Sequence, residues 1–338
     1  MLSDSLFILL VVAATALLAR RPVPSARAAA AAGLLLAGAA LTRTIALPLI
    51  LLAVLVLAVR RVPWRRLAVL ALSGLLPVAA YAGWYAGVHG RFAIGGGDGV
   101  ALWARTMTFA DCSVVRPPPD LAPLCPNGTV LDAAGEYVWA RESSLNRLPG
   151  GHAALNDRAR AFALRAIAAQ PLDYLRAVAR DTALAFPWTP VAHPARVVPA
   201  FGFAAGMWSL PADQPLVEQV RREYDPGLTG MRSVRPYADL LVAYQYPAYL
   251  RGPLLAAVLL VGAVGAVRRP RTAALPWAVA VTLLVAPVAV LDFDHRYVLP
   301  VVPVACLAAG LAFRRAPRHP AAPGGAAAHE APVAGTRA

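Results

Sequence analysis

Clusters of arginine alternate with long apolar stretches along this chain, and they fall on every second connection between those stretches. The clusters follow the first, third, fifth and last apolar stretches, at residues 20–21, 60–66, 268–271 and 314–318. Connections that carry arginine stay on the cytoplasmic side of a bilayer. The pattern therefore predicts a multi-pass protein of the cell membrane, with its N-terminus outside, its C-terminus in the cytoplasm and the remaining connections outside.

The composition favours the same class of protein. The 338-residue chain is 59% hydrophobic and 15% charged, and its mean hydropathy of +0.57 is above what a soluble globular domain carries. Its formal net charge is +14, but the arginines lie at the ends of apolar stretches, where they contact anionic lipid headgroups. We therefore expect membrane lipid, and no nucleic acid, as a partner. All basic residues except histidine are arginine; a GC-rich genome and guanidinium–phosphate recognition both remain open as reasons.

Seven apolar stretches approach the roughly 20 residues that a helix needs to cross a bilayer. We expect an all-α polytopic membrane fold with about seven transmembrane helices. Four of them lie in residues 1–89 and three in residues 252–313, and residues 314–338 can bury too little apolar surface to be more than a disordered cytoplasmic tail. The expected helices are residues 2–19, 23–41, 44–59, 67–88, 254–267, 275–291 and 297–313.

Residues 90–251 form a connection far longer than an ordinary loop, which predicts a large extracytoplasmic region with a fold of its own or a functional lid. Within it, residues 156–188 have the pattern of an amphipathic helix that is interrupted at Gln170, because Pro171 suits the first position of a new helix. The apolar and arginine-rich faces of this segment suit the membrane interface. Packing beneath a soluble cap domain is an equally open interpretation.

Two of the three cysteines, Cys112 and Cys125, lie in this long connection, whereas Cys306 lies in the last apolar stretch. The outside of the membrane permits disulfides. We therefore predict a disulfide between Cys112 and Cys125, which would close a short proline-rich loop and stabilise the fold by roughly 3 kcal/mol in the chain-entropy model. The cysteines have no CxxC spacing and no neighbouring histidine, and we assign no metal ligands.

The candidate functional residues lie at the outer ends of apolar stretches, since the chain lacks the common nucleotide-binding, zinc-protease and serine-hydrolase motifs. Asp4 begins the first stretch, and Arg43 stands between the second and third. Ionisable groups near membrane depth are costly, so a function is the first hypothesis for them. For Arg296, the alternative to a function is an ion pair that only stabilises the end of a helix. The run between the sixth and seventh stretches contains Asp292, Asp294, His295, Arg296 and Tyr297.

Several local patterns occur in order along nearly the whole chain. They are Ser3-Asp4-Ser5-Leu6-Phe7, Gly38 with Leu41-Thr42-Arg43, Arg91-Phe92 after an apolar stretch, the helix of residues 166–186, and residues 294–300. Together with the expected topology, they resemble the GT-C superfamily of glycosyltransferases, including its protein mannosyltransferase and RgtA/B/C/D-like branches. The resemblance implies transfer of a sugar from a polyprenyl-phosphate donor to an acceptor at the outer membrane face.

The chain departs from this family at its N-terminus. In the family, the catalytic aspartate lies in the first outer loop, well before the helix that residues 3–7 resemble, whereas this chain begins at that helix. The resemblance therefore implies that an odd number of N-terminal helices and the usual base are absent. A late start of the reading frame, a remnant protein, or a separate chain that supplies the missing part would each account for this.

In the family mechanism, a carboxylate deprotonates an acceptor hydroxyl, and cationic groups stabilise the departing polyprenyl phosphate. The resemblance implies Arg43, Arg105 and Arg296 as phosphate-binding residues. It adds Asp294, His295 and Tyr297 around the donor. Asp98 and Asp111 are the candidate catalytic carboxylates, although neither matches the motif of the family. The lipid-linked donor is a substrate; no cofactor is expected, and dependence on a divalent metal stays open.

Two other functions remain open. One is a transporter or channel, against which the chain shows no internal repeat, no paired broken helices and no intramembrane carboxylates. The other is a non-catalytic membrane partner that retains the donor-binding half of the enzyme. The two hypotheses differ in whether sugar transfer needs a carboxylate of this chain: a transferase needs one, and a non-catalytic partner does not.

Overall fold

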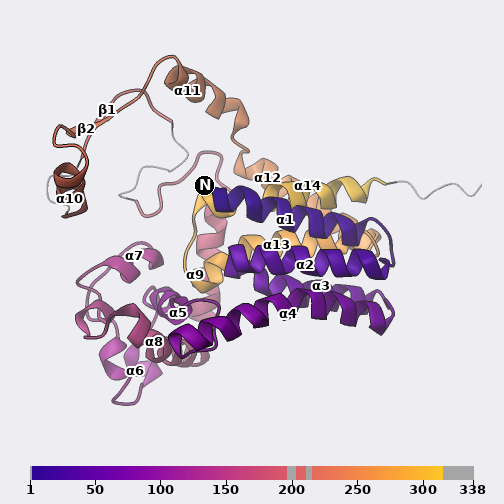
Figure 1. Ribbon diagram of the computed structural model, residues 1–338, viewed down its shortest axis with the longest axis horizontal. Helices are drawn as coiled ribbons and strands as arrows, with labels where there is room; N and C mark the ends of the chain where they lie inside the picture. The colour runs from indigo at the N-terminus through magenta and orange to yellow at the C-terminus, as the bar shows by residue number, and fades with distance from the viewer. Residues whose placement is uncertain (1, 196–202, 211–214, 315–338) are drawn as a thin grey trace, which may run out of the picture.

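The computed structural model describes residues 2–195, 203–210 and 215–314 (Figure 1). These residues are mostly helical. The expectation of an all-α fold is wrong in one small respect, because β1 (Met207–Ser209) and β2 (Gly230–Arg232) pair in a two-stranded antiparallel sheet, with Trp208 opposite Met231. The tail predicted for residues 314–338 lies outside the described residues, apart from Arg314.

The seven apolar stretches form helices that lie side by side in one bundle (Figure 1). Most of their ends follow from local sequence; the side chain of Ser25, for example, accepts a hydrogen bond from Ala28 N and begins the second helix. Two 3-10 turns, η1 (Thr44–Ala46) and η5 (His295–Tyr297), precede two of these helices. The bundle helices are α1 (Leu2–Ala19), α2 (Ala26–Thr42), α3 (Leu47–Val59), α4 (Trp64–His89), α12 (Gly252–Arg268), α13 (Ala274–Val290) and α14 (Val301–Ala312).

Helix length supports two or three of the seven expected spans. Trp64–His89 and His295–Ala312 are long and apolar enough to cross a membrane. A third span results if α11 (Tyr237–Ala248) is counted together with α12, from which it is bent by 42°. The helices α1, α2, α3 and α13 are apolar but have 18, 17, 13 and 17 residues, which is short of the roughly 20 that a straight span needs.

Small residues let α2 and α4 approach closely within the bundle. A Cβ atom added to Gly33 on α2 would lie 2.0 Å from Ser73 Oγ and 2.6 Å from the Leu70 carbonyl oxygen on α4. Such contacts between small residues are typical of helix pairs in membranes. The backbone oxygen of Leu70 cannot rotate away, so this contact fixes the distance between the two helices.

Replacing Gly33 with alanine is therefore expected to push α2 and α4 apart. We expect Gly33→Ala to be less stable than Gly38→Ala by about 1–3 kcal/mol, the usual cost of overpacking. Gly38 is the matched control because it lies on the same helix and has only an ordinary contact, 3.4 Å from Leu10 Cδ1. Thermal unfolding of both purified variants in the same detergent measures the difference, and equal melting temperatures would contradict it.

Residues 98–169, called the cap here, enclose a second hydrophobic core. Trp103, Leu124 and Phe162 are fully buried in it. The predicted disulfide between Cys112 and Cys125 is present, with the two Cα atoms 6.1 Å apart. The helices of the cap are α5 (Asp98–Thr106), α6 (Cys112–Val115), α7 (Ala134–Trp139) and α8 (Gly151–Ala169), with 3-10 turns η2 (Ala122–Leu124) and η3 (Leu145–Arg147).

The predicted helix break at Gln170 is confirmed, because α8 ends at Ala169 and α9 (Pro171–Thr182) begins at the proline. Of the two interpretations of this segment, packing within a cap holds for α8, and a position of α9 at the membrane interface stays a prediction. The α8 helix packs in the cap core, whereas α9 packs its buried Val178 against the bundle and exposes Leu172 and Leu175. Tyr174 Oη donates a hydrogen bond of 3.0 Å to the carbonyl oxygen of Ala289 on α13. The cap is thus fastened to the bundle through α9, which is followed by the 3-10 turn η4 (Ala183–Ala185).

A separate arm contains β1, α10 (Pro215–Glu223), β2 and α11. Figure 1 shows it extending from the start of α12, on the other side of the bundle end from the cap. Within the described part of the arm, α11 has no buried residue. From the sequence we predicted no secondary structure in this arm.

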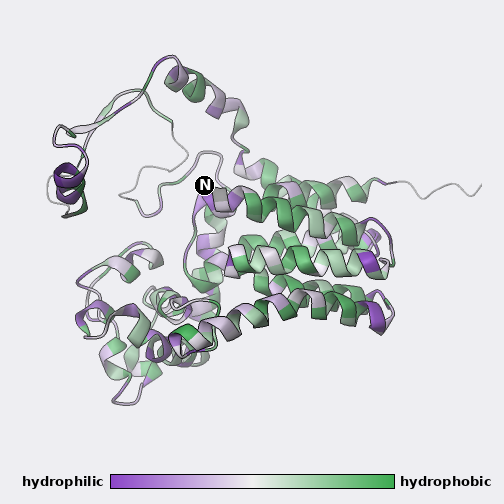
Figure 2. Cartoon of the chain, in the orientation of Figure 1, coloured by the Kyte–Doolittle hydropathy of each residue, from purple (hydrophilic) through white to green (hydrophobic). Residues whose placement is uncertain are grey.

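The two ends of the bundle differ in character. Figure 2 shows polar residues at both ends and an apolar band between them. The arginine-bearing connections lie at the end away from the cap, where Arg66 Nη1 donates a 3.0 Å hydrogen bond to the carbonyl oxygen of Pro24. The cap and α9 lie at the opposite end, called the cap end below.

Candidate functional site

Four of the residues singled out in the sequence lie around one small cavity at the cap end of the bundle. Asp4 comes from the start of α1, Arg43 from the connection after α2, and Arg296 and Tyr297 from η5. The structure therefore brings together residues that are more than 250 positions apart in the chain. The other residues that line the cavity are Phe7, Ile45, Leu283, Pro287 and Pro300.

Local sequence holds these side chains in place. Phe7 is buried in the bundle core and fixes the face of α1 that carries Asp4 one turn earlier. Thr42 Oγ1 donates a 2.7 Å hydrogen bond to the Gly38 carbonyl oxygen, and α2 ends at Thr42, after which Arg43 is extended. The tight turn between two apolar helices thus presents the Arg43 guanidinium at the bundle end.

Both guanidinium groups of the cavity have carboxylate partners. Arg43 forms an ion pair with Asp4, and about a fifth of each side chain is exposed. Arg296 Nε lies 2.9 Å from Asp294 Oδ2, and Arg296 Nη2 donates to Tyr297 Oη at 3.4 Å. Asp294 also begins η5, because its Oδ1 accepts a 2.9 Å hydrogen bond from Arg296 N. The helix-ending ion pair considered for Arg296 is therefore present, with Asp294 as the partner.

A second cavity lies between α1 and α14 at the arginine end of the bundle. Its volume is about 460 Å³, and most of its lining is apolar. Arg20 and Arg314 border it, which confirms that the first and last arginine clusters lie at the same end. The apolar lining consists of Ala13, Ala16, Leu17, Ala19, Leu307 and Leu311.

The structure places Arg105 away from Arg43 and Arg296, the other two predicted phosphate-binding residues. Its side chain is fully buried, and its Nη1 donates to Asp181 Oδ2 instead of facing the cavity lined by Arg43 and Arg296. Its Nε and Nη2 atoms have no partner among the described residues. Arg105 lies on α5, a short helix of the cap, and its burial was not visible from the sequence.

The two candidate bases also lie elsewhere. Asp98 pairs with Arg160 and accepts a 3.2 Å hydrogen bond from Asn156. Partial burial tends to raise the pKa of Asp98, but these two partners outweigh it and hold that pKa below its ordinary value. Asp111 is the N-cap of α6 and accepts from Ser113 N at 2.9 Å. Neither carboxylate lines the cavity of Arg43 and Arg296.

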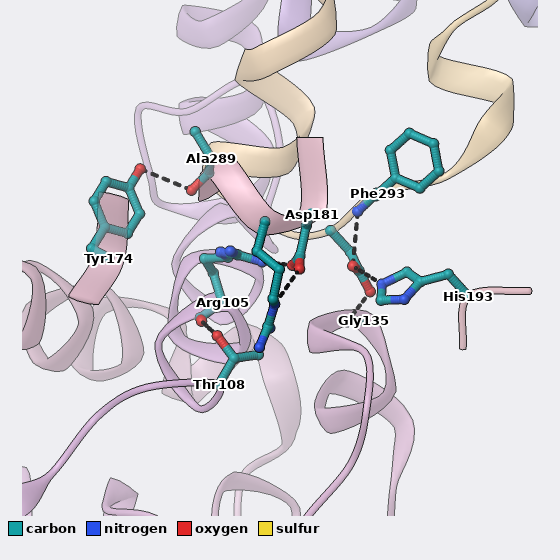
Figure 3. Close-up of polar contacts among 10 residues, drawn as sticks. Arg105, Thr108, Gly135, Tyr174, Asp181, His193, Ala289 and Phe293 are labelled. Carbon is teal, nitrogen blue, oxygen red and sulfur yellow. Dashed lines mark hydrogen bonds and ion pairs between the residues drawn. The ribbon is translucent and has the colours of Figure 1, made fainter. Parts of the chain in front are cut away.

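His295 does not line this cavity either; its Nε2 lies 3.2 Å from the Val191 carbonyl oxygen. The neighbouring Asp292 belongs to a different cluster, shown in Figure 3, which the sequence analysis missed. Asp292 Oδ1 lies 2.7 Å from His193 Nε2, and Asp181 lies beside them. The hydrogen bond with Asp292 raises the pKa of His193, against the lowering effect of burial.

This second cluster is largely shielded from solvent. The side chains of His193 and Asp292 are 11% and 12% exposed, and that of Asp181 is 4% exposed. Their ligand atoms all lie within 4.8 Å of one another, which makes them a group that could hold a metal ion. Separations of 12 and 99 residues in the chain hide this group from any search for ligand spacing.

Comparison of the chain with family models, curated proteins and solved structures finds no match. Any function proposed for it therefore depends on its own residues.

Proposed function

We propose that this chain is a seven-span glycosyltransferase of the cell membrane, or the donor-binding part of one. It would take a sugar from a polyprenyl-phosphate donor and transfer it to an acceptor at the outer face. The observation that carries the proposal is the cavity where Arg43 and Arg296 meet at the cap end of the bundle. Two guanidinium groups beside an apolar bundle suit a lipid-linked phosphate.

The distribution of charge supports an outer location for this cavity. The arginine-bearing connections gather at the opposite end of the bundle, and such connections stay in the cytoplasm. The Cys112–Cys125 disulfide lies at the cap end, which fits an oxidising compartment. The N-terminus would then be outside and the C-terminus in the cytoplasm. Because nucleotide sugars are cytoplasmic, an enzyme at the outer face needs a donor linked to lipid.

Binding of the donor phosphate would proceed by exchange of ion-pair partners. The cavity itself has room for little more than a water molecule, about 10 Å³. A phosphate would displace the Asp4 carboxylate from Arg43 and share Arg296 with Asp294. As the bond to the sugar breaks, negative charge grows on the phosphate, and the two guanidinium groups stabilise it. Tyr297 Oη, which accepts from Arg296, keeps that side chain in place.

The helices α1 and α14 offer a place for the hydrocarbon part of the donor. The helix α1 lines both the cationic cavity at the cap end and the apolar cavity at the arginine end. The connection before α14 lines the cationic cavity, and α14 itself lines the apolar one. A polyprenyl chain that follows α1 and α14 inward from Arg43 would reach the apolar cavity. Membrane lipid is the alternative occupant of this apolar cavity.

Donor binding tests the proposal directly. We expect Arg43→Gln and Arg296→Gln each to weaken binding of a short-chain polyprenyl-phosphate sugar by about 10-fold or more, since each removes a charge-assisted hydrogen bond. Arg141→Gln, an exposed arginine of the cap, should bind as the unchanged protein does. Asp4→Asn should bind at least as tightly, because it frees Arg43. Unchanged affinity in the Arg43→Gln, Arg296→Gln double variant would refute the proposal.

A second candidate, a non-catalytic donor-binding partner, is favoured by one observation. Asp98 and Asp111, the candidate bases, are both held in structural contacts away from the cavity. A sugar-transfer assay on the Asp98→Asn, Asp111→Asn double variant separates the possibilities, because full activity excludes both residues as bases. Loss of activity with donor binding intact would instead support a base in this chain.

A further inference from the structure

We propose that Asp181, His193 and Asp292 form a binding site for a divalent transition-metal cation of the zinc or manganese type. The three residues come from α9, from the loop that follows η4, and from the connection between α13 and η5. The site would join these three elements where the cap meets the bundle. It is separate from the cavity of Arg43 and Arg296, and the proposal does not depend on sugar transfer.

The donor set suits such a cation. Imidazole nitrogen combined with carboxylate oxygen is a common ligand set for zinc and manganese, and less suited to calcium, which prefers oxygen alone. Bonds of about 2.0–2.2 Å place the ligand atoms of a tetrahedral zinc roughly 3.3–3.5 Å apart. The three ligand atoms here already lie within 4.8 Å of one another. Small side-chain rotations would therefore bring the three ligand atoms into position around one cation.

The surroundings hold the ligands in advance of any cation. Asp292 Oδ2 accepts a 2.8 Å hydrogen bond from Gly135 N, and Oδ1 accepts one of the same length from Phe293 N. A Cβ atom on Gly135 would lie 3.3 Å from Asp292 Oδ2, so the glycine permits this approach. Arg105 orients Asp181 from the opposite side (Figure 3). Outer contacts that orient the ligands are characteristic of metal sites in proteins.

The charges around the cluster are close to balanced with either a proton or a cation in it. The carboxylates of Asp132, Asp181 and Asp292 all act on His193. Two arginines supply positive charge beside these carboxylates. Both Arg105 and Arg180 form ion pairs with Asp181, and Arg180 Nε lies 3.0 Å from Asp181 Oδ1. Three carboxylates and two guanidinium groups leave one negative charge. A protonated His193 would cancel this charge, and a divalent cation with neutral His193 would leave one positive charge.

The buried donors of Arg105 are compatible with a cation in the cluster. Its side chain is 0% exposed, yet Nε and Nη2 have no partner among the described residues. Buried donors of this kind normally find an acceptor. A cation with three protein ligands keeps an open position for water or an anion, and such a group beside Asp181 would supply the missing acceptor.

Metal content of the purified full-length chain tests the site. After loading with Zn²⁺ or Mn²⁺ and removal of the excess, we expect about one equivalent in the unchanged protein. The variants His193→Ala and Asp292→Asn should lose it. His152→Ala is the matched control, because His152 lies in the cap with its Nε2 2.9 Å from Asn146 Oδ1, outside the cluster. Equal metal in His193→Ala and His152→Ala would overturn the proposal, as would no bound metal in the unchanged protein.

Cobalt substitution gives a second measurement that needs no variant to fold. Co²⁺ bound by one imidazole and two carboxylates should give visible absorption bands that saturate at one equivalent and disappear on addition of Zn²⁺. A spectrum that stays that of aqueous Co²⁺ would count against the site. The melting temperature of the unchanged protein should also rise with Zn²⁺, and that of His193→Ala should not; equal shifts in both would contradict a site at His193.

Discussion

Replacing Asp181 with leucine should lower the free energy of unfolding by about 3–5 kcal/mol, the usual cost of stranding one member of a buried ion pair. The side chains of Arg105 and Asp181 are 0% and 4% exposed. Without Asp181, the Arg105 guanidinium would be buried with no anion beside it, since its Nε and Nη2 already lack partners among the described residues. Unfolding should be measured with a chelator present, so that a bound cation does not contribute.

The double variant Arg105→Met, Asp181→Leu separates a stranded charge from a simple loss of packing. It removes both charges and fills the space with apolar side chains, which is often neutral or even stabilising. We therefore expect the double variant to be more stable than Asp181→Leu alone. A double variant that is as unstable as the sum of its single variants would show that the two residues act independently.

Replacing Asn156 with alanine should lower the free energy of unfolding by about 2–4 kcal/mol, because two buried N–H groups would lose their acceptor. Asn156 is fully buried, and its Oδ1 accepts from Gly99 N at 2.8 Å and from Val100 N at 3.1 Å. These are N–H groups of the first turn of α5, which no preceding residue of the helix can satisfy. Thermal unfolding of the purified variant measures the effect.

Asn127→Ala is the matched control for this prediction. Asn127 lies in the same cap and also uses its side chain twice, accepting from Thr129 N at 3.2 Å and donating to the Glu142 carbonyl oxygen at 2.8 Å. It is exposed, so water can replace both contacts and the cost should stay below about 1 kcal/mol. Equal destabilisation by the two substitutions would mean that burial of the Asn156 contacts has little effect on stability.

Much of the bundle could be predicted because hydrophobic stretches and their charged ends carry a strong signal. The expected helix of residues 2–19 is α1 with the same bounds, and the break before Pro171 was found at the right residue. The small sheet was missed because β1 and β2 have three residues each, are almost entirely exposed and are separated by 20 residues. Strands this short leave no alternation of apolar and polar residues to detect.

The candidate site, like the fold, could be predicted from the sequence only in part. Arg43 and Arg296 could be placed together from topology alone, since both lie at helix ends on one side of the predicted membrane. Arg105 could not be assigned, because its burial depends on how α5 packs within the cap. His193 and Asp181 gave no signal, as their partner Asp292 is far away in the chain and the loop that carries His193 has no regular structure.

The separate core of the cap has a consequence for how the protein is made. Its buried residues run from Val100 to Ala166, and its disulfide lies within the same range. In the proposed topology, the cap can therefore fold once α4 is inserted and this range has been translocated, while the ribosome is still synthesising α12. Domains commonly fold in this order during synthesis. The last three helices would then pack against a finished cap, and Ala289 on α13 would accept its hydrogen bond from Tyr174 on α9.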